Sequence, residues 1–158
     1  MLAYARRRAP AALADDAAAE TFAIAWRKAQ QVPVEPLPWL LAVTRRVLAS
    51  QRRSALRQNR LRARLDWALE LAVPDEEGSE RIRAAVARLS ERDREALLLV
   101  AWEGLTPKEA AIVVGISTTG FSVRLHRARR RLRTLLGEDD VSTLPAFHEA
   151  PTRKAETP

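Results

Sequence analysis

The sequence contains no cysteine and only two histidines, His126 and His148, in 158 residues. Without thiols the chain can form neither a disulfide framework nor a zinc site with thiolate ligands. It also lacks paired carboxylates in a cleft pattern, a nucleophile with a neighbouring base and a glycine-rich phosphate loop. We therefore predict that the protein is not an enzyme and that it needs no metal and no cofactor.

Aromatic residues are scarce, at 5% of the chain, and long apolar runs are missing. No segment approaches the roughly 20 apolar residues that span a bilayer, and the first ten residues, MLAYARRRAP, do not resemble a secretory signal. We expect a cytoplasmic protein without membrane insertion, in which Leu, Val and Ala fill most of the core.

Acidic residues are fewer than basic ones: the chain has 27 Lys and Arg and 20 Asp and Glu, which gives a formal charge of +7. A strongly basic chain indicates an anionic partner, either nucleic acid or a membrane surface. No acidic residue stands between Glu35 and Asp66, where eight arginines occur. This density favours phosphate binding over a solvated face. These arginines are Arg45, Arg46, Arg52, Arg53, Arg57, Arg60, Arg62 and Arg64.

Strand patterns are also missing, and good helix formers dominate, so we predict an all-α protein. The spacing predicts a first helix from Asp15 to Gln30 and a second from Pro38 to at least Arg53, separated by a proline-rich loop or helix entry. The first helix has an apolar stripe, in which we expect Phe22 and Trp26 to belong to the core. The stripe consists of Ala18, Phe22, Ala25, Trp26 and Ala29.

An acidic stretch, PDEEGSE at 74–80, predicts a boundary between two small helical domains. We predict a first domain at 1–56, a flexible acidic linker at 57–79, a four-helix domain with a helix-turn-helix at 80–137 and a disordered tail at 138–158. In the second domain Ile82, Val86 and Leu89 line one helix, and Ser90 caps the next.

The stretch TPKEAAIVVGISTTGFSVRLHRARRR, at 106–131, has the pattern of a helix-turn-helix. Thr106 and Glu109 form a capping box, and Gly115 suits a turn with positive φ. Ser117 then caps a second helix, whose buried stripe is Phe121, Leu125, Ala128 and Leu132. The alternative is a plain pair of helices in a bundle. DNA binding is favoured because residues 124–133 hold six arginines and no acid, whereas a bundle surface usually mixes signs.

Two blocks of the chain resemble the bacterial extracytoplasmic-function sigma factors of RNA polymerase. DDAAAETFAIAWRK followed by PWLLAVTRRVLASQRR is similar to the family's promoter-melting domain, sigma region 2. LSERDREALLLVAWEGLTPKEAAIVVGISTTGFSVRLHRARRRL is similar to its promoter-reading domain, sigma region 4. The family's first domain has a fuller first helix, so we expect either that this domain is N-terminally truncated or that the start codon is misplaced.

The resemblance implies core RNA polymerase, promoter DNA and an anti-sigma factor as partners. It assigns polymerase binding to Asp16, Glu20 and Thr21. It assigns the −10 element to the proline loop and to Trp39, Arg45, Arg46, Arg52 and Arg53. It assigns the −35 element to Lys108, Thr118, Thr119, Ser122, Arg124, His126, Arg127 and Arg130.

Two alternatives stay open from the sequence. One is a helix-turn-helix regulator of the response-regulator type, which would not need the first block. The other is a truncated sigma-like decoy that binds polymerase or an anti-sigma factor without initiating transcription. Since Ser122 stands where the family usually has a basic residue, we expect Arg127 to carry more of the base reading.

Overall fold

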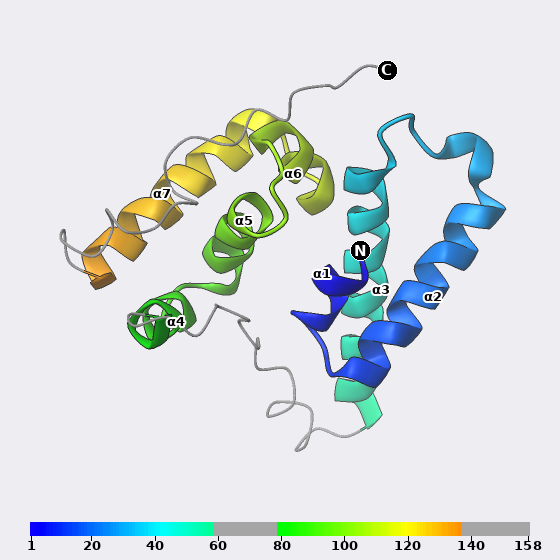
Figure 1. Cartoon of the computed structure of the whole chain (residues 1–158), viewed down its shortest axis with the longest axis horizontal. Coiled ribbons are helices and arrows are strands. Elements are labelled where there is room, and N and C mark those ends of the chain that lie inside the picture. The colour runs from blue at the N-terminus through cyan, green and yellow to red at the C-terminus, as the bar shows by residue number, and fades with distance from the viewer. Residues whose placement is uncertain (59–78, 137–158) are drawn as a thin grey trace. The chain divides into compact units, whose positions relative to one another are not determined.

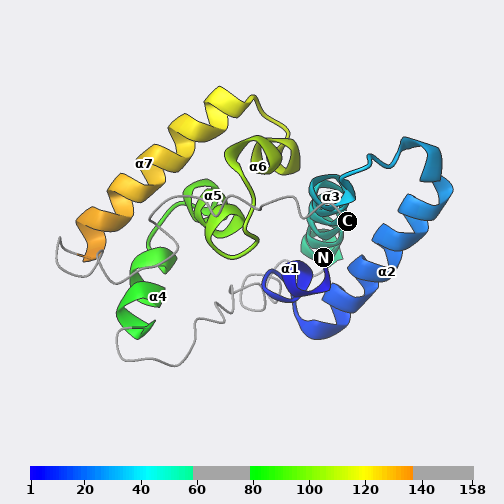
Figure 2. The ribbon, with the colours of Figure 1, turned by 45° about the horizontal axis from the view of Figure 1, so that its top comes forward.

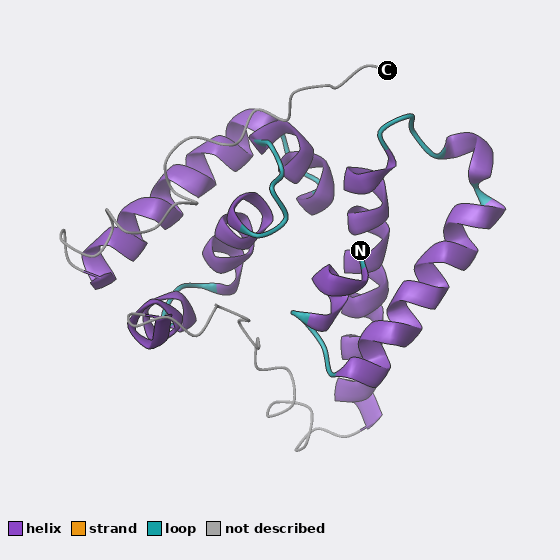
Figure 3. Cartoon of the chain, in the orientation of Figure 1, coloured by secondary structure: helices purple, strands orange, loops and turns teal. Residues whose placement is uncertain are grey.

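Every regular element in the described residues is a helix (Figure 3). The computed structural model describes residues 1–58 and 79–136, and the chain divides into two compact units. The predicted all-α class is therefore confirmed. The predicted tail and nearly all of the predicted linker lie outside the described residues. The described ends of that linker, Arg57 and Gln58 on one side and Ser79 on the other, belong to helices.

The first unit consists of three α-helices and one short 3-10 turn. Its elements are α1 (Leu2–Arg6), α2 (Ala11–Arg27), η1 (Ala29–Gln31) and α3 (Pro36–Gln58), and the three α-helices pack against one another (Figure 1). An ion pair of 3.0 Å between Arg6 and Asp15 ties α1 to α2. Pro36 opens α3, where a missing N–H costs nothing. The non-helical connection is therefore shorter than the predicted proline loop.

The buried face of α2 differs from the predicted one. Its fully or nearly fully buried residues are Ala14, Ala17, Ala18 and Thr21. Phe22 is 61% exposed and Trp26 is 86% exposed, so the prediction that both belong to the core is wrong. Small alanine side chains allow close packing of helices, and here they form the buried side of α2 while the two aromatic rings lie on the exposed side.

A buried hydroxyl pair joins α2 to α3. The Thr21 hydroxyl lies 2.7 Å from the Ala17 carbonyl oxygen and 3.2 Å from the Thr44 hydroxyl. The Thr44 hydroxyl in turn donates to the Leu40 carbonyl at 2.8 Å. Both threonines are 0% exposed, so these bonds satisfy polar groups that cannot reach water.

The remaining helices are α4 (Ser79–Ala87), α5 (Glu91–Ala101), α6 (Pro107–Val114) and α7 (Thr118–Leu136), and the name second unit is used for residues 79–136. Both α4 and α5 pack on α7, and α6 meets the N-terminal end of α7 (Figure 1 and Figure 2). The predicted stripe on α7 is buried, with Phe121 at 0% exposure, and Leu136 extends it by one further turn. This stripe fixes which face of α7 remains outside.

The start of each helix in the helix-turn-helix is set by a local hydrogen bond. Glu109 accepts from the backbone N–H of Thr106 at 2.7 Å, while the Thr106 hydroxyl accepts from the Glu109 N–H at 3.3 Å, as a capping box requires. Gly115 has φ of 74°, and the Ser117 hydroxyl accepts from Gly120 N–H at 3.1 Å. The predicted capping box, turn and cap are therefore confirmed.

Candidate nucleic-acid interface

The outer face of α7 is polar and basic. Thr118, Thr119, Ser122, His126, Arg127 and Arg130 are all exposed, as is Lys108 on α6. Arg124 is half-buried. All of these side chains belong to the helix-turn-helix, and the α7 set spans a little more than three turns. A helix carrying such a face can enter the major groove with its first turns and lie beside phosphates further along.

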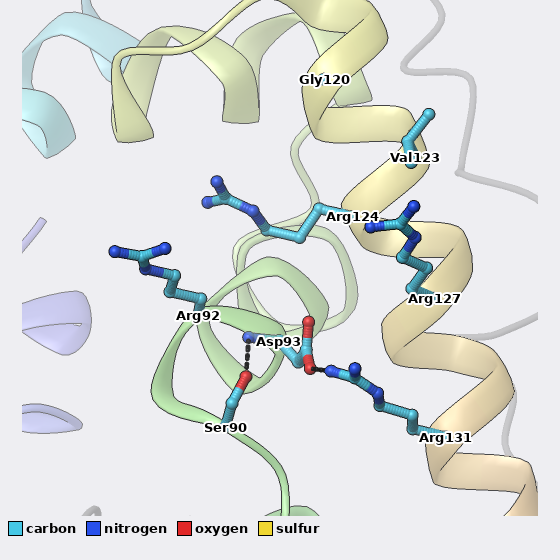
Figure 4. A pocket seen from close by; sticks show the side chains of 8 residues that line it. All are labelled: Ser90, Arg92, Asp93, Gly120, Val123, Arg124, Arg127 and Arg131. Atoms are coloured by element: carbon cyan, nitrogen blue, oxygen red, sulfur yellow. Dashed lines mark hydrogen bonds and ion pairs between the residues drawn. The ribbon is translucent and has the colours of Figure 1, made fainter.

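A hollow of about 350 Å³ lies between α7 and the N-terminal turn of α5. Arg92 lines it from α5, and Arg124, Arg127 and Arg131 line it from α7, with Ser90 and Asp93 at its α5 side (Figure 4). Four guanidinium groups in one concave surface favour an anion. The hollow adds Arg92 to the candidate phosphate contacts, and no local sequence pattern indicates that Arg92 lies beside α7.

Asp93 is the acidic residue in that hollow. Its side chain is 8% exposed, and Oδ2 accepts a charge-assisted hydrogen bond from Arg131 (Figure 4). Its backbone N–H donates to the hydroxyl of Ser90 at 3.2 Å, as predicted for a cap by Ser90. A residue in the first turn of α5 is thus bonded to a residue 38 positions later in the chain.

Arg129 lies on a different side of α7 and is half-buried. Burial, followed by the charge of nearby Arg133, lowers the pKa of the Arg129 guanidinium from its ordinary value. Both effects disfavour the charged form, so the approach of an anion would stabilise it. Arg129 and Arg133 thus place two neighbouring positive charges in the C-terminal half of α7.

On α3, the residues assigned to the −10 element lie at two levels of burial. Arg46, Arg52 and Arg53 are exposed, whereas Trp39 and Arg45 are half-buried. All five come from one continuous helix that starts just after the short connection at 32–35. Of the other arginines of this run, Arg60, Arg62 and Arg64 lie outside the described residues.

The residues assigned to polymerase binding do not form one surface. Asp16 and Glu20 are exposed on α2, but Thr21 is 0% exposed and points to Thr44 on α3. The assignment of Thr21 to a contact surface is therefore wrong. Phe22 and Trp26 are on the outside instead. Their spacing relative to Thr21 and Ala25 is compatible with either an aromatic or an alanine-lined buried face, so the sequence alone does not decide which side of α2 is exposed.

Among the described helices, none is long and apolar enough to cross a membrane. In the same residues there is no group of three or more potential metal-binding side chains.

Comparison with known proteins identifies the family. Residues 79–132 match the family model described as Sigma-70, region 4. Over 145 residues the chain is 32% identical to the RNA polymerase sigma factor CnrH of Cupriavidus metallidurans, covering 79% of this chain and 74% of CnrH. The chain belongs to the sigma-70 family, as a sigma factor of the extracytoplasmic-function type.

Other relatives agree with this family. The sigma factor is 33% identical over 141 residues to "Probable RNA polymerase sigma factor RfaY" of Xanthomonas campestris pv. campestris, covering 79% of this chain and 34% of RfaY. It therefore spans about a third of RfaY. A solved structure, the sigma factor RpoE in complex with the anti-sigma factor NepR from Bartonella quintana, is similar with a TM-score of 0.65. That match has 25% identity and covers 85% of this chain and 88% of RpoE.

These matches also bear on the response-regulator alternative. The matches to CnrH and RfaY each cover 79% of this chain, which is more than the second unit alone could supply. A regulator that shares only a helix-turn-helix domain would leave the first unit unexplained. No observation on this chain favours that alternative.

Proposed function

We propose that this sigma factor binds core RNA polymerase and directs promoter-specific initiation of transcription. The first unit would read the −10 element and the second the −35 element. The sigma factor would act in the cytoplasm, where polymerase and promoters are, with no catalytic role of its own. The observation that best supports this proposal is the capped helix-turn-helix. Its second helix buries one apolar stripe and exposes a polar, arginine-rich face.

In the second unit, the first turns of α7 are the base-reading part. Thr119, Ser122 and His126 recur at helical spacing on the exposed face. Arg127, also exposed, has the reach and the paired donors for the O6 and N7 acceptors of guanine. Arg130, three residues further along, would fall beside the backbone together with Lys108, Arg92 and Arg124.

In the first unit, α3 is the candidate contact for melted DNA. Its exposed arginines supply positive charge for the phosphates of a single strand, and half-buried Trp39 offers an aromatic ring for base stacking at the start of the helix. The connection at 32–35 would receive a base extruded from the stack. These roles require that α3 and the connection face the DNA together.

The exposed face of α2 is the candidate polymerase contact. It carries two acids, Asp16 and Glu20, together with the rings of Phe22 and Trp26. Large aromatic residues are unusual on the surface of a free protein and are typical anchors in protein interfaces. The family docks this helix on the clamp helices of the polymerase's largest subunit, and the exposed rings support that role here.

An anti-sigma factor is part of the proposal as a second protein partner. The support is the Bartonella RpoE structure, which was solved with such a factor bound. The match covers 85% of the sigma factor, which is more than either unit alone, so it extends over both units.

A transcription assay with core polymerase of the same organism tests this function. Fragments from the genome's upstream regions are transcribed with and without the sigma factor, and the 5′ ends of the products are sequenced. We expect sigma-dependent start sites that share two sequence elements at a fixed spacing. Retention of core polymerase without any start site would instead identify a decoy, and no retention would refute the proposal.

A charge-reversal variant tests polymerase binding, and a second charge reversal outside α2 is its matched control. Changing Asp16 and Glu20 together to Lys should reduce retention of core polymerase, because both carboxylates lie on the proposed contact face. Glu35→Lys reverses an exposed acid outside α2 and should leave retention unchanged. Equal retention by the double variant and the wild type would remove these two acids from the interface.

A further inference from the structure

We propose that Asp93 is a specificity-determining residue that holds Arg131 within the second unit and so keeps it off the DNA backbone. The inference rests on the proposed binding of DNA by α7. It concerns which of the arginines on that helix bind phosphate and which do not.

The carboxylate that holds Arg131 is buried, although the Arg131 side chain is itself 60% exposed. The Asp93 carboxylate comes from the first turn of α5, is 8% exposed and bonds to Arg131 on α7. The backbone of Asp93 is itself fixed, since its N–H donates to the Ser90 hydroxyl that caps α5. A buried carboxylate cannot easily exchange a guanidinium partner for water, so the pair is expected to persist when DNA is absent.

Three arginines of α7 share one side of the helix but differ in their partners. Arg124, Arg127 and Arg131 are spaced by three and then four residues, and all line the same hollow. Within the described residues, Arg131 is ion-paired, whereas no ion pair engages Arg124 or Arg127. Asp93 is the one acid among the described residues that line the hollow, so it can neutralise only one of these arginines.

This division affects the balance between specific and non-specific binding. Each phosphate that a protein neutralises on duplex DNA steepens the dependence of log affinity on log salt by about 0.9, whatever the sequence. An arginine held by Asp93 contributes nothing to that term. Non-specific affinity is then lower, while base contacts from the first turns of α7 are unaffected, so the ratio of specific to non-specific affinity rises.

The test measures the salt dependence of non-specific binding by the full-length protein. Fluorescence anisotropy reports binding to a short duplex of random sequence between about 50 and 200 mM KCl. Asp93→Asn should release Arg131 and steepen the slope by about 0.9, which is roughly a three- to fourfold larger change in affinity over that range. Adding Arg131→Ala to Asp93→Asn should restore the wild-type slope.

Two single variants provide the matched comparison. Arg131→Ala alone should leave the slope as in wild type, whereas Arg124→Ala, on the same side of α7, should make it shallower by about 0.9. Circular dichroism checks that each variant folds. Should Asp93→Asn fail to fold, the comparison of Arg131→Ala with Arg124→Ala decides on its own.

Two kinds of failure are distinguishable. If Arg131→Ala makes the slope as shallow as Arg124→Ala does, or if folded Asp93→Asn keeps the wild-type slope, Asp93 does not withhold Arg131. The proposed DNA-binding function would survive that result. If the wild type fails to bind the duplex at the lowest salt, DNA binding by α7 fails and the role of Asp93 fails with it.

Discussion

Trp26 offers a direct test of the outward face of α2. With 86% of its surface exposed, the side chain contributes little to folding, and Trp26→Ala should change the free energy of unfolding by less than about 0.5 kcal/mol. If α2 docks on polymerase, the same substitution should weaken the complex strongly. A loss of polymerase binding without a loss of stability would identify Trp26 as an interface residue and not a core residue.

The size of the binding effect follows from the exposed area. A buried tryptophan covers about 150–250 Å². With 86% of that area available, at about 25 cal/mol per Å², docking of Trp26 contributes roughly 3–5 kcal/mol. Part of this is offset by ordering the side chain, so we expect Trp26→Ala to cost about 2 kcal/mol, or roughly 30-fold in Kd.

The assay is a titration of fluorescently labelled sigma factor with core polymerase, paired with urea unfolding of the sigma factor alone. Val34→Ala is the surface control, because Val34 is fully exposed but lies outside α2. Leu41→Ala is the core control, since Leu41 is 1% exposed and its truncation should cost about 2–5 kcal/mol of stability. Unchanged Kd for Trp26→Ala, or a stability loss comparable to that of Leu41→Ala, would refute the reasoning.

Three further outcomes are expected. Changing Arg45 and Arg46 to Ala should reduce open-complex formation in a permanganate footprint, because phosphate contacts supply much of the affinity for DNA; unchanged melting would contradict the −10 assignment. Arg127→Ala should relax base preference at one or two −35 positions, where a bidentate contact is worth about 1–3 kcal/mol, while Arg130→Ala should weaken all sequences alike. Selection from randomised duplexes distinguishes the two, and an unaltered preferred sequence for Arg127→Ala would exclude it as a reader. Thr21→Val should lower the free energy of unfolding by about 1 kcal/mol in urea without affecting polymerase retention, because its hydroxyl bonds are internal; a loss of retention by the folded variant would place Thr21 at the interface.

The helix-turn-helix could be predicted from sequence because its signals are local. The capping box at Thr106 and Glu109, the turn at Gly115 and the cap at Ser117 each act within three or four residues. The stripe that begins at Phe121 is made of large apolar residues over several turns, so its buried side is unambiguous.

The inward face of α2 could not be predicted in the same way. Hydropathy weights Phe22 and Trp26 far above alanine, so the sequence favoured the aromatic side as the core. The packing depends instead on how closely α2 approaches its neighbours, which favours Ala14, Ala17 and Ala18. The hydroxyl bond that fixes Thr21 inside also needs a partner on α3, which no local pattern reveals.

The individual residues of the candidate site on α7 could be predicted from the sequence, but their contacts with residues of α5 could not. The arginines were apparent as a run of like charge, whereas the pair of Asp93 with Arg131 joins positions 38 residues apart. Such a contact depends on how α5 packs on α7, and sequence spacing does not carry that information.

The crowding of positive charge on α7 has a consequence for handling the protein. Like charges repel within the folded helix: the pKa of Arg129 is lowered first by burial and then by the charge of Arg133. Added salt screens that repulsion and stabilises the second unit, but it also competes for the phosphates that the same arginines would bind. Ionic strength therefore acts in opposite directions on the folding and the DNA binding of one helix. A buffer chosen for high thermal stability would therefore weaken the proposed binding to promoter DNA.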